Sequence, residues 1–481
     1  MNKDLKIMAT PDMRSARDRR KKPIELVYPE IEVSHALREF ARGKTFYLRT
    51  YGCQANVRDS ENLAGLLEYA GFTYTNILEK ADVIFLNTCA IRENAEDKVF
   101  GEIGSLKALK VENPNLIIGL GGCMPQQEHV VTSVKTKYPQ VDIVFGTHNI
   151  HKILDLMTTV IEEKTRVIDV ESIQGSVIET PLVRRLDDKK AYVNIIYGCD
   201  KFCTYCIVPY TRGRERSRTK ADIIAECQIL IDAGYQEITL LGQNVNAYGK
   251  DRPAEGDFAD LLREVAKLGI PRLRFVTSHP WDFTSQMIDV IASYPNIMKA
   301  IHLPVQSGSD EILRRMGRRY SREHYLKLVA EMRAKIPDIA ITTDIIVGFP
   351  GETKEQFEET LTLVDAVHYD GAFTFIYSPR MGTPAAKMID DVTAEEKHER
   401  YERLIQHTEA STTASSLKMV GGTYAVLVDG VSKRNKNRLS GYTENGKLVH
   451  FVGEPALVGQ IVQVKIIDSK VYSLQGEYVR A

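Results

Sequence analysis

The sequence predicts an α/β protein built from three ordered parts. Strand-like and helix-like stretches alternate from Lys44 onward, and a second alternating series runs from Tyr192 to Tyr377. After Gly421 the pattern changes to short strands separated by turn residues. Strands that alternate with helices predict parallel sheets, whereas successive short strands predict a small barrel or sandwich. We therefore expect a parallel-sheet α/β domain, a central partial (βα)6 barrel and a small OB-like β-barrel.

Composition favours a reduced, non-membrane setting for the 481 residues, whose formal net charge is −1. Residues 1–43 are polar and mixed in charge and lack the apolar core of a signal peptide, which predicts a disordered tail. No apolar run reaches the ~20 residues of a membrane span, so we expect a cytoplasmic protein with no membrane partner. In that compartment the seven cysteines are expected to be reduced, which favours metal or catalytic roles over disulfides.

The N-terminal domain, expected over residues 44–165, repeats one arrangement three times. A cysteine closely follows each apolar strand-like run, at Cys53, Cys89 and Cys123. The carboxyl ends of parallel strands meet at one edge of a sheet, so these thiols should converge. One such cysteine would more often be a small packing residue, but three in equivalent places predict a shared metal site. We infer a cubane iron–sulfur cluster with one iron free of protein ligands, favoured by the positive ends of the following helices.

Cys227 is expected to have a different role. It lies at helical spacing from Ile223, Ile224 and Leu230 within ADIIAECQILIDAG, which predicts a packed core thiol.

The barrel, expected over residues 185–415, carries a second group of cysteines. Cys199, Cys203 and Cys206 form Cys-x3-Cys-x2-Cys directly after the first barrel strand, on the edge where barrel sites lie. Three thiolates can hold three irons of a cubane cluster and leave the fourth open to a small molecule. Zinc is the main alternative, but structural zinc takes four ligands, usually as two pairs, and no second pair follows. A disulfide is less expected still without secretion signals.

Six barrel strands are expected over residues 191–198, 237–243, 272–278, 298–305, 339–349 and 371–378. Glycines and polar side chains near their carboxyl ends can approach and hold the amino-acid and ribose parts of a small molecule. The candidates are Gly242, Gln243, Asn244, Ser278, Gln306, Asp344 and Gly348. Each motif is weak by itself, and residues 348–352 could be only a tight turn. His279 and His302 could equally be structural.

A charged amphipathic helix precedes the C-terminal module, which is expected over residues 418–481. Five strands are predicted at residues 423–432, 438–444, 447–453, 461–469 and 472–479. The module interleaves cations with aromatic rings, at Lys433, Arg434, Lys436, Arg438, Tyr442, His450 and Phe451. Cations bind phosphate and rings stack on unpaired bases, which favours RNA binding, although a solvated hairpin is an equal alternative on this stretch alone.

A second basic run follows the cysteine loop directly. Arg212, Arg214, Arg216 and Arg218 alternate along it. The position of this run beside the barrel site predicts contact with phosphates or with the small molecule, and the alternative is a solvated turn.

The motifs together resemble two nested families. The Cys-x3-Cys-x2-Cys run resembles the radical S-adenosylmethionine (SAM) superfamily, in which SAM occupies the open iron. Three further cysteines, a partial barrel and a terminal TRAM-type barrel resemble the methylthiotransferases over almost the whole chain after the tail. TYGCQ, NTCAIRENAEDKVF, YTRGRERSR, LLGQNVNAYG, TSHP and SPRMGTPAA are similar to the MiaB-type branch. The branch that acts on a ribosomal protein typically has proline where this chain has Gln54.

The resemblance implies a substrate, cofactors and partners. The substrate is tRNA with N6-dimethylallyladenosine 3′ of the anticodon, methylthiolated at carbon 2 of the adenine. Two 4Fe-4S clusters are implied, one on Cys53, Cys89 and Cys123 as sulfur carrier and one on the barrel cysteines. One SAM methylates a sulfur of the first cluster, and a second SAM yields a 5′-deoxyadenosyl radical at the other. A flavodoxin- or ferredoxin-like electron donor and a monomer are also expected.

Two other functions stay open at this point. One is a methylthiotransferase acting on an aspartate of a ribosomal protein, against which the context of Cys53 argues. The other is a non-catalytic RNA-binding metalloprotein, against which the open fourth sites argue.

Overall fold

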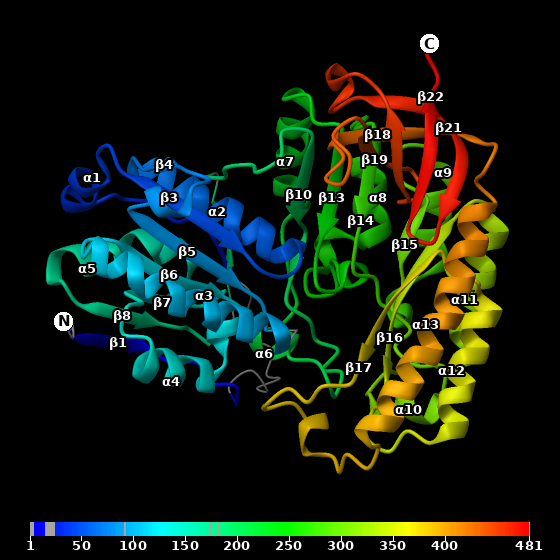
Figure 1. Cartoon of the computed structure of the whole chain (residues 1–481), viewed down its shortest axis with the longest axis horizontal. Helices are drawn as coiled ribbons and strands as arrows, with labels where there is room; N and C mark the ends of the chain where they lie inside the picture. The colour runs from blue at the N-terminus through cyan, green and yellow to red at the C-terminus, as the bar shows by residue number, and fades with distance from the viewer. Residues whose placement is uncertain (1–3, 15–24, 91–92, 173–175, 181, 481) are drawn as a thin grey trace. The chain divides into compact units, whose positions relative to one another are not determined.

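The computed structural model describes residues 4–14, 25–90, 93–172, 176–180 and 182–480 (Figure 1). The chain forms two compact units. Unit 1 comprises residues 1–186, 196–202 and 206–218, and unit 2 comprises residues 187–195, 203–205 and 219–481. Unit 1 therefore takes in two segments, 196–202 and 206–218, that the sequence assigned to the barrel.

Unit 1 is built on a parallel sheet of seven strands in the order β1-β8-β7-β6-β5-β3-β4. The strands span Leu5–Ala9 (β1), Thr45–Thr50 (β3), Thr73–Tyr74 (β4), Val83–Thr88 (β5), Ile117–Gly122 (β6), Ile143–Phe145 (β7) and Arg166–Asp169 (β8). Two short pairs, β2 (Glu25–Val27) with β9 (Ser176–Ile178) and β11 (Ile196–Tyr197) with β12 (Arg216–Ser217), complete the unit. The parallel α/β architecture expected of this part is confirmed.

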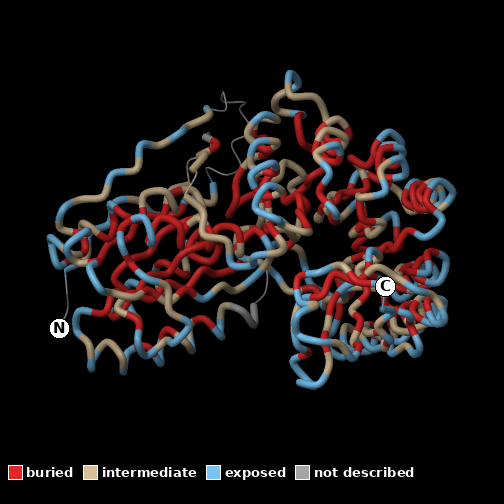
Figure 2. Tube along the Cα trace, turned by 90° about the horizontal axis from the view of Figure 1, so that it is seen from above, coloured by how far each residue is buried: buried red, intermediate tan, exposed pale blue. Residues whose placement is uncertain are grey.

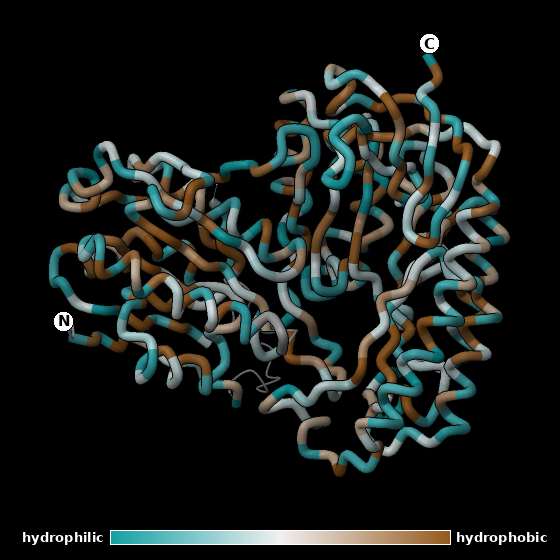
Figure 3. The backbone as a smooth tube through the Cα atoms, in the orientation of Figure 1, coloured by the Kyte–Doolittle hydropathy of each residue, from teal (hydrophilic) through white to brown (hydrophobic). Residues whose placement is uncertain are grey.

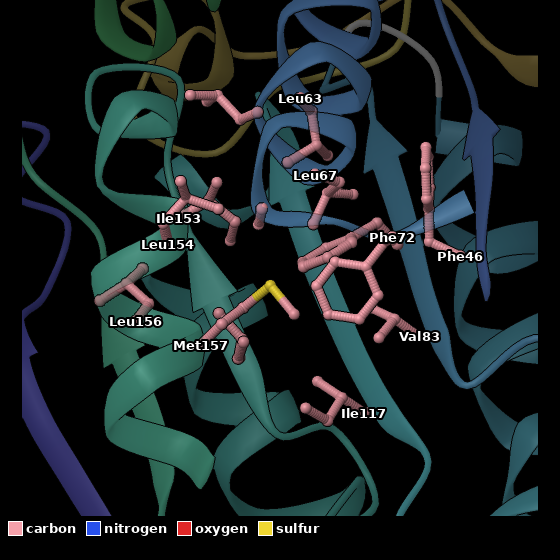
Figure 4. Close-up of a cluster of buried hydrophobic side chains, with 14 of the residues drawn as sticks. Phe46, Leu63, Leu67, Phe72, Val83, Ile117, Ile153, Leu154, Leu156 and Met157 are labelled. Carbon is pink, nitrogen blue, oxygen red and sulfur yellow. The ribbon is translucent and has the colours of Figure 1, made fainter. Parts of the chain in front are cut away.

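Helices cover both faces of the seven-stranded sheet. The unit 1 helices are α1 (His35–Ala41), α2 (Gln54–Ala70), α3 (Glu93–Glu112), α4 (Glu128–Lys137), α5 (Ile153–Glu163) and α6 (Val208–Thr211). Successive side chains of β5 alternate between the faces, so Val83 and Phe85 pack with α1, α2 and α5, whereas Ile84 and Leu86 pack with α3 and α4. Figure 4 shows the first of these clusters, with side chains of α2, α5 and the strands pointing toward one another. The sheet is thereby buried on both faces, as a parallel sheet requires.

The expectation of a disordered tail over residues 1–43 is wrong for the segments that the structure describes. Leu5–Ala9 forms edge strand β1 and pairs with β8 in parallel. His35–Ala41 forms α1, whose N-cap Ser34 accepts a hydrogen bond from the Leu37 amide. Residues 1–3 and 15–24 lie outside the described ranges.

Unit 2 contains the six expected barrel strands. They are β10 (Lys190–Asn194), β13 (Glu237–Leu241), β14 (Arg272–Phe275), β15 (Ala300–His302), β16 (Ala340–Val347) and β17 (Gly371–Ile376). Two parallel three-stranded sheets, β10-β13-β14 and β15-β16-β17, are joined by a parallel bridge between Leu273 and Ile297. Figure 2 shows much of the chain inside both units as buried, and Figure 3 shows apolar residues running along the strands. The partial-barrel prediction is confirmed.

Helices follow the barrel strands, and most begin at a residue whose side chain caps the helix. They are α7 (Lys220–Asp232), α8 (Phe258–Lys267), α9 (Ser285–Ser293), α10 (Asp310–Arg315), α11 (Arg322–Lys335), α12 (Lys354–Val367) and α13 (Ala394–Leu417). Asp257, Thr353 and Thr393 each form a capping box that satisfies two backbone amides at a helix start. Cys227 on α7 is fully buried, as expected of a core thiol.

The C-terminal barrel, residues 423–478, is a closed sheet in the order β18-β19-β20-β22-β21. Its strands are β18 (Thr423–Val431), β19 (Leu439–Thr443), β20 (Leu448–Val452), β21 (Ile461–Lys470) and β22 (Ser473–Tyr478). Alternate residues point inward, so Val449 and Phe451 join the buried core while His450 faces outward. The five expected strands are confirmed.

The C-terminal barrel docks on the amino-terminal ends of the (βα)6 strands. Arg272, the first residue of β14, donates to the carbonyls of Tyr442 (2.8 Å) and Ala425 (2.7 Å). Lys190, the first residue of β10, pairs with Asp429 at 2.9 Å. The Lys447 ammonium donates to the carbonyl of Asp370, just before β17. The opposite, carboxyl ends of the same strands therefore stay available for a site.

No helix among the described residues is long and apolar enough to cross a membrane.

Candidate functional site

The three N-terminal cysteines follow β3, β5 and β6 at one edge of the seven-stranded sheet. Cys53 is the N-cap of α2, and Cys89 and Cys123 are each 4% exposed. The Cys123 amide donates to the carbonyl of Thr88 at 2.8 Å, which ties the ends of β5 and β6 together. The Cys123 thiol interacts electrostatically with the thiols of Cys89 and Cys53, so the three lie near one another at this edge, as the strand positions predicted.

Two glycines make this convergence possible. Gly52 and Gly122 have φ of 124° and 96°, backbone values that residues other than glycine rarely adopt. A Cβ at Gly52 would lie 2.6 Å from the Cβ of Cys89, and one at Gly122 would lie 2.4 Å from the Thr88 carbonyl oxygen. Any side chain at either position would push the strand ends apart and separate the thiols.

The chemistry of this group of thiols suits a soft metal cluster. Among the described residues, no set of three or more His, Cys, Asp or Glu side chains has the arrangement of ligands to a single metal ion. Burial raises the pKa of the Cys123 thiol to about 12, and the Arg212 guanidinium opposes this rise. A coordinating metal would deprotonate such a thiol, and iron–sulfur clusters are held by thiolates. Three neighbouring thiols, of which Cys89 and Cys123 are buried, beside a buried cation therefore fit a cubane cluster with one open iron.

A buried polar network surrounds these thiols and was missed by the sequence reasoning. The Asn56 amide donates to the Thr88 carbonyl at 2.8 Å, and its oxygen lies 3.5 Å from Cys53 Sγ. The Asn87 amide donates to the Asn56 carbonyl (2.8 Å) and to Ser60 Oγ (2.9 Å). The signal in the sequence was the polar run NVRDSE in the first half of a helix whose second half is mostly apolar. Buried polar groups that satisfy each other fix the strand ends that carry the cysteines.

Arg212 enters the same network from the segment behind the barrel cysteines. It is 7% exposed, and its Nη2 donates to Asp59 Oδ2 (2.6 Å) and Asn56 Oδ1 (3.1 Å). Burial lowers its pKa, but Asp59, Cys123 and Cys53 outweigh burial, so the pKa of Arg212 lies well above its usual value. Arg212 is therefore a fixed positive charge at the N-terminal thiols.

The other three arginines of the basic run also have internal partners. Arg214 pairs with Asp200 through Nε (2.5 Å) and Nη2 (2.8 Å), and Arg218 pairs with Glu179 at 2.5 Å. Arg216 is 6% exposed and donates to the Arg212 carbonyl. The solvated-turn alternative is wrong, because Arg212, Arg216 and Arg218 are buried, whereas contact of this run with phosphates or SAM stays a prediction.

The barrel cysteines lie on a loop that both units share. Cys199 and Cys206 belong to unit 1, where the Cys199 amide donates to the Gly213 carbonyl at 3.0 Å. Cys203 belongs to unit 2 and is 6% exposed, and Arg318 Nη1 lies 3.6 Å from its sulfur. The guanidinium of Arg318 is held in turn by the Pro304 carbonyl at 2.6 Å. The buried guanidinium therefore places a positive charge beside the Cys203 sulfur, and iron–sulfur clusters are held by thiolates.

The expected SAM-binding residues lie at the carboxyl ends of the barrel strands. Three of them, Asn244, Ser278 and Gln306, are between 1% and 6% exposed. Each carries a buried oxygen (Asn244 Oδ1, Ser278 Oγ, Gln306 Oε1) for which the described part of the chain supplies no hydrogen-bond partner. Such atoms are costly unless a ligand or water satisfies them, so these three positions fit a polar cofactor.

Backbone strain marks the same strand ends. Thr277 and Gln306 have φ of 69° and 73°, and non-glycine residues in this region cost on the order of 1 kcal/mol or more. The strain is maintained by the neighbouring strand, since the Gln306 amide donates to the Asp344 carbonyl at 2.8 Å. Strained residues of this kind are concentrated at ligand-binding sites.

Asn244, through its amide nitrogen, Asp344 and Gly348 already have partners within the protein. Asn244 Nδ2 donates to Asp282 at 2.6 Å. Asp344 lies 3.4 Å from His302 Nε2, and the Gly348 amide donates to Glu352 at 2.7 Å. Gly242 is buried and Gln243 is half-buried at the end of β13.

A basic depression of about 410 Å³ lies on the C-terminal barrel. It is lined by Ser432, Arg434, Asn435, Arg438, His450, Asp468, Lys470, Ser473 and Gln475. Lys433 and Lys436 are exposed on the adjoining β18–β19 loop, and Tyr442 is 39% exposed. Phe451, expected to stack on RNA, is fully buried in the barrel core, because it shares the inward face of β20 with Val449. The sequence reasoning missed Lys470, which lies on a strand distant in sequence.

Comparison with known proteins identifies the three parts. Residues 193–364 match the radical SAM superfamily, residues 45–146 match "Uncharacterized protein family UPF0004", and residues 417–479 match the TRAM domain. A solved radical S-adenosylmethionine methyltransferase, TsrM from Kitasatospora setae, covers 71% of this chain and 77% of its own at a TM-score of 0.51. Its sequence identity is 17%, so this likeness concerns the fold.

Curated relatives match along nearly the full length. The tRNA-2-methylthio-N(6)-dimethylallyladenosine synthase of Oceanobacillus iheyensis is 51% identical over 98% of this chain and 91% of that protein. The protein of the same name from Shouchella clausii is 50% identical over 100% of this chain and 92% of that protein. With half of its residues shared over both lengths, this chain belongs to the tRNA-2-methylthio-N(6)-dimethylallyladenosine synthase family.

Proposed function

We propose that this chain is an enzyme that adds a methylthio group to carbon 2 of N6-dimethylallyladenosine, at the position 3′ of the anticodon in tRNA. The observation that carries this proposal is the full-length identity of about half to relatives with that name. It favours tRNA over a ribosomal-protein aspartate as substrate. The radical SAM match favours an enzyme over a non-catalytic RNA-binding protein.

The radical SAM domain implies an iron–sulfur cluster and SAM as cofactors. We extend this to two 4Fe-4S clusters, an auxiliary one on Cys53, Cys89 and Cys123 and a radical one on Cys199, Cys203 and Cys206. Two separate groups of three thiols, each with a buried arginine at one member, support that count. When bound, these groups supply the sulfur, the methyl group and the radical that the reaction needs.

The side chains of this protein bind and orient the cofactors and exclude water from them. Arg318 places a positive charge beside Cys203, and Arg212 places one beside the N-terminal thiols. Ser278 and Gln306 offer buried oxygens to the amino-acid or ribose groups of SAM. The buried interior of the barrel keeps bulk water from a reactive species formed at the strand ends.

We place the RNA contact on the basic depression of the C-terminal barrel. Arg434, Arg438 and Lys470 line it with His450, whose pKa is lowered by burial and by these three cations, so it is a neutral hydrogen-bonding group there. Cations with neutral donors suit phosphate and 2′-hydroxyl groups. Because this barrel docks on the amino-terminal ends of the strands, it contacts RNA away from the reacting base, and the base itself is extruded toward the carboxyl ends.

The reaction also needs a source of electrons and a cellular setting. A flavodoxin- or ferredoxin-like protein donates the electrons, and the enzyme works as a monomer in the cytoplasm. The family and the TRAM match support tRNA as its partner.

The decisive test is an anaerobic assay with matched cysteine variants. Reconstituted protein, SAM, reductant and an anticodon stem-loop with dimethylallyladenosine should yield a nucleoside heavier by one methylthio group, measured by mass spectrometry. Cys199→Ala should abolish 5′-deoxyadenosine formation, whereas Cys89→Ala should retain it and lose the methylthio product. Cys227→Ala, which changes a core thiol outside both groups, should retain product. Product from Cys89→Ala would show that the N-terminal thiols do not carry the sulfur.

A further inference from the structure

A buried cation links the segment behind the radical cysteines to the auxiliary thiols. Arg212 directly follows α6, the short helix that begins two residues after Cys206. Ile207 and Tyr210 of this segment form one buried cluster with Cys123 and Ala90. All of these residues belong to unit 1, so the segment that leaves the radical loop is part of the wall of the auxiliary site.

Two groups from α2 fix the guanidinium in place. Arg212 Nη2 donates to Asp59 Oδ2 at 2.6 Å and to Asn56 Oδ1 at 3.1 Å. Asn56 is fully buried, and it also contacts Cys53 Sγ and the carbonyl of Thr88, the residue before Cys89. The position of the guanidinium is therefore set by the same network that positions two of the thiols.

The positive charge of Arg212 and the negative charge of Asp59 cancel, so thiolates at this site add net negative charge. Asp59, 5% exposed, offsets one positive charge, and Arg212 offsets one negative charge. A cubane cluster on three thiolates adds net negative charge, which increases by one when it is reduced. A fixed cation in a poorly solvated site stabilises the more negative state, and a fixed anion destabilises it.

We propose that Arg212 is a positioning residue that raises the reduction potential of the auxiliary cluster and that Asp59 opposes it. The inference rests on the proposed function, because it takes Cys53, Cys89 and Cys123 as ligands of an iron–sulfur cluster. The pair sets the potential through opposite charges at one location, with Asn56 relaying the geometry to Cys53. The radical loop thereby contributes the charge that tunes the second site.

Arginine suits this position better than lysine does. A planar guanidinium can bind a carboxylate and a neighbouring amide oxygen at fixed angles while facing a third group, and an ammonium is a compact point charge on a flexible stem. Arg212→Lys should keep the sign of the charge and lose part of its placement, which separates charge from geometry.

The test measures a potential and not a turnover. Full-length protein in which Cys199, Cys203 and Cys206 are all replaced by alanine would hold only the auxiliary cluster. Its midpoint potential is measured by an anaerobic redox titration followed by electron paramagnetic resonance, with no RNA present. Arg212→Gln, Arg212→Lys and Asp59→Asn are compared in that background. Arg49→Gln, an exposed arginine of the same unit paired with Glu102, is the matched control for loss of one positive charge.

Opposite shifts are the expected result. Arg212→Gln should move the midpoint to more negative potential, Asp59→Asn to more positive potential, and Arg212→Lys to an intermediate value, while Arg49→Gln leaves it unchanged. Equal midpoints, or shifts of one sign for both Arg212→Gln and Asp59→Asn, would overturn the proposal. If Arg212→Gln holds no cluster, Asp59→Asn and Arg212→Lys decide the sign.

Failure of this inference and failure of the proposed function give different results. If the background variant binds no iron–sulfur cluster, both the auxiliary cluster and the tuning by Arg212 are refuted. If the cluster binds and its potential ignores Arg212 and Asp59, only the tuning is refuted. If the variants show the expected shifts in potential but the wild-type protein makes no methylthio product, the proposed substrate is refuted instead.

Discussion

Replacing Arg272 with methionine should detach the C-terminal barrel without unfolding the (βα)6 barrel. Arg272 is 2% exposed, and its two terminal nitrogens reach main-chain carbonyls of β18 and β19. Methionine keeps most of the apolar volume of the side chain and removes both donors. Glu237, whose pKa is raised by burial, would also lose one of the cations that oppose this rise.

The size of the effect follows from the two hydrogen bonds. A hydrogen bond to a charged group contributes about 1.5–3 kcal/mol, and each carbonyl of Ala425 and Tyr442 would lose its arginine partner at a buried contact. The two bonds together give about 3–6 kcal/mol of docking free energy. At 1.4 kcal/mol per factor of ten, the undocked population should rise by about 10²–10⁴.

Hydrogen exchange resolved by peptide is the suitable assay, because the free energy concerns one part of the chain. Protection in β18 and β19 should fall in Arg272→Met, while protection in β16 stays at the wild-type level. Arg263→Met on α8, where the arginine pairs with Asp260 near the surface, is the matched control. Unchanged exchange in β18 and β19, or an equal loss in β16, would refute the docking role of Arg272.

Three further predictions concern SAM binding, the pH dependence of stability and RNA affinity. Gln306→Leu should weaken SAM binding about fivefold, the value of one hydrogen bond of about 1 kcal/mol, and a calorimetric affinity equal to wild type would remove Gln306 from the pocket. Burial and the cations Arg216 and Arg212 lower the pKa of His148 to about 3, so the unfolded chain takes up its proton below about pH 6.5 and the folded chain does not. Unfolding free energy should therefore fall as the pH falls from 7 to 5, with a shallower slope in His148→Gln and the wild-type slope in the exposed-site control His398→Gln. Arg438→Gln should reduce the salt slope of RNA affinity by about 0.7–0.9, one phosphate contact, whereas Lys327→Gln on α11 should leave it unchanged. Equal slopes for both variants would place the RNA elsewhere.

Local patterns in the sequence predicted the strands well. Nine of these eleven strands lie within the expected segments, and β10 and β21 each extend one residue beyond theirs, because apolar runs bounded by turn residues carry that information locally. Edge strand β1 was missed since its partner, β8, lies about 160 residues away and its own side chains are mostly exposed. A short terminal segment is predicted to be disordered unless the strand with which it pairs is known.

The candidate site divides in the same way. The cysteines were visible because their spacing and their places after strands are local features. The partners of Arg212 and Arg218 were not visible, since Asp59 and Glu179 reach them only through the fold. Phe451 was misplaced although the alternation of β20 contained the answer: Val449 and Phe451 share one face, and His450 has the other. The alternation of side chains along a strand therefore predicts which residues can contact RNA better than the presence of aromatic residues does.

The docking of the C-terminal barrel has a consequence for how this architecture can diversify. Arg272 recognises Ala425 and Tyr442 through main-chain oxygens, so the side chains at those two positions are free to vary without loss of either bond. The reacting end of the strands lies at the far side from this attachment. An appended module held by its backbone can thus be remodelled for another nucleic-acid shape, or exchanged for another small barrel, while the chemistry it serves stays untouched.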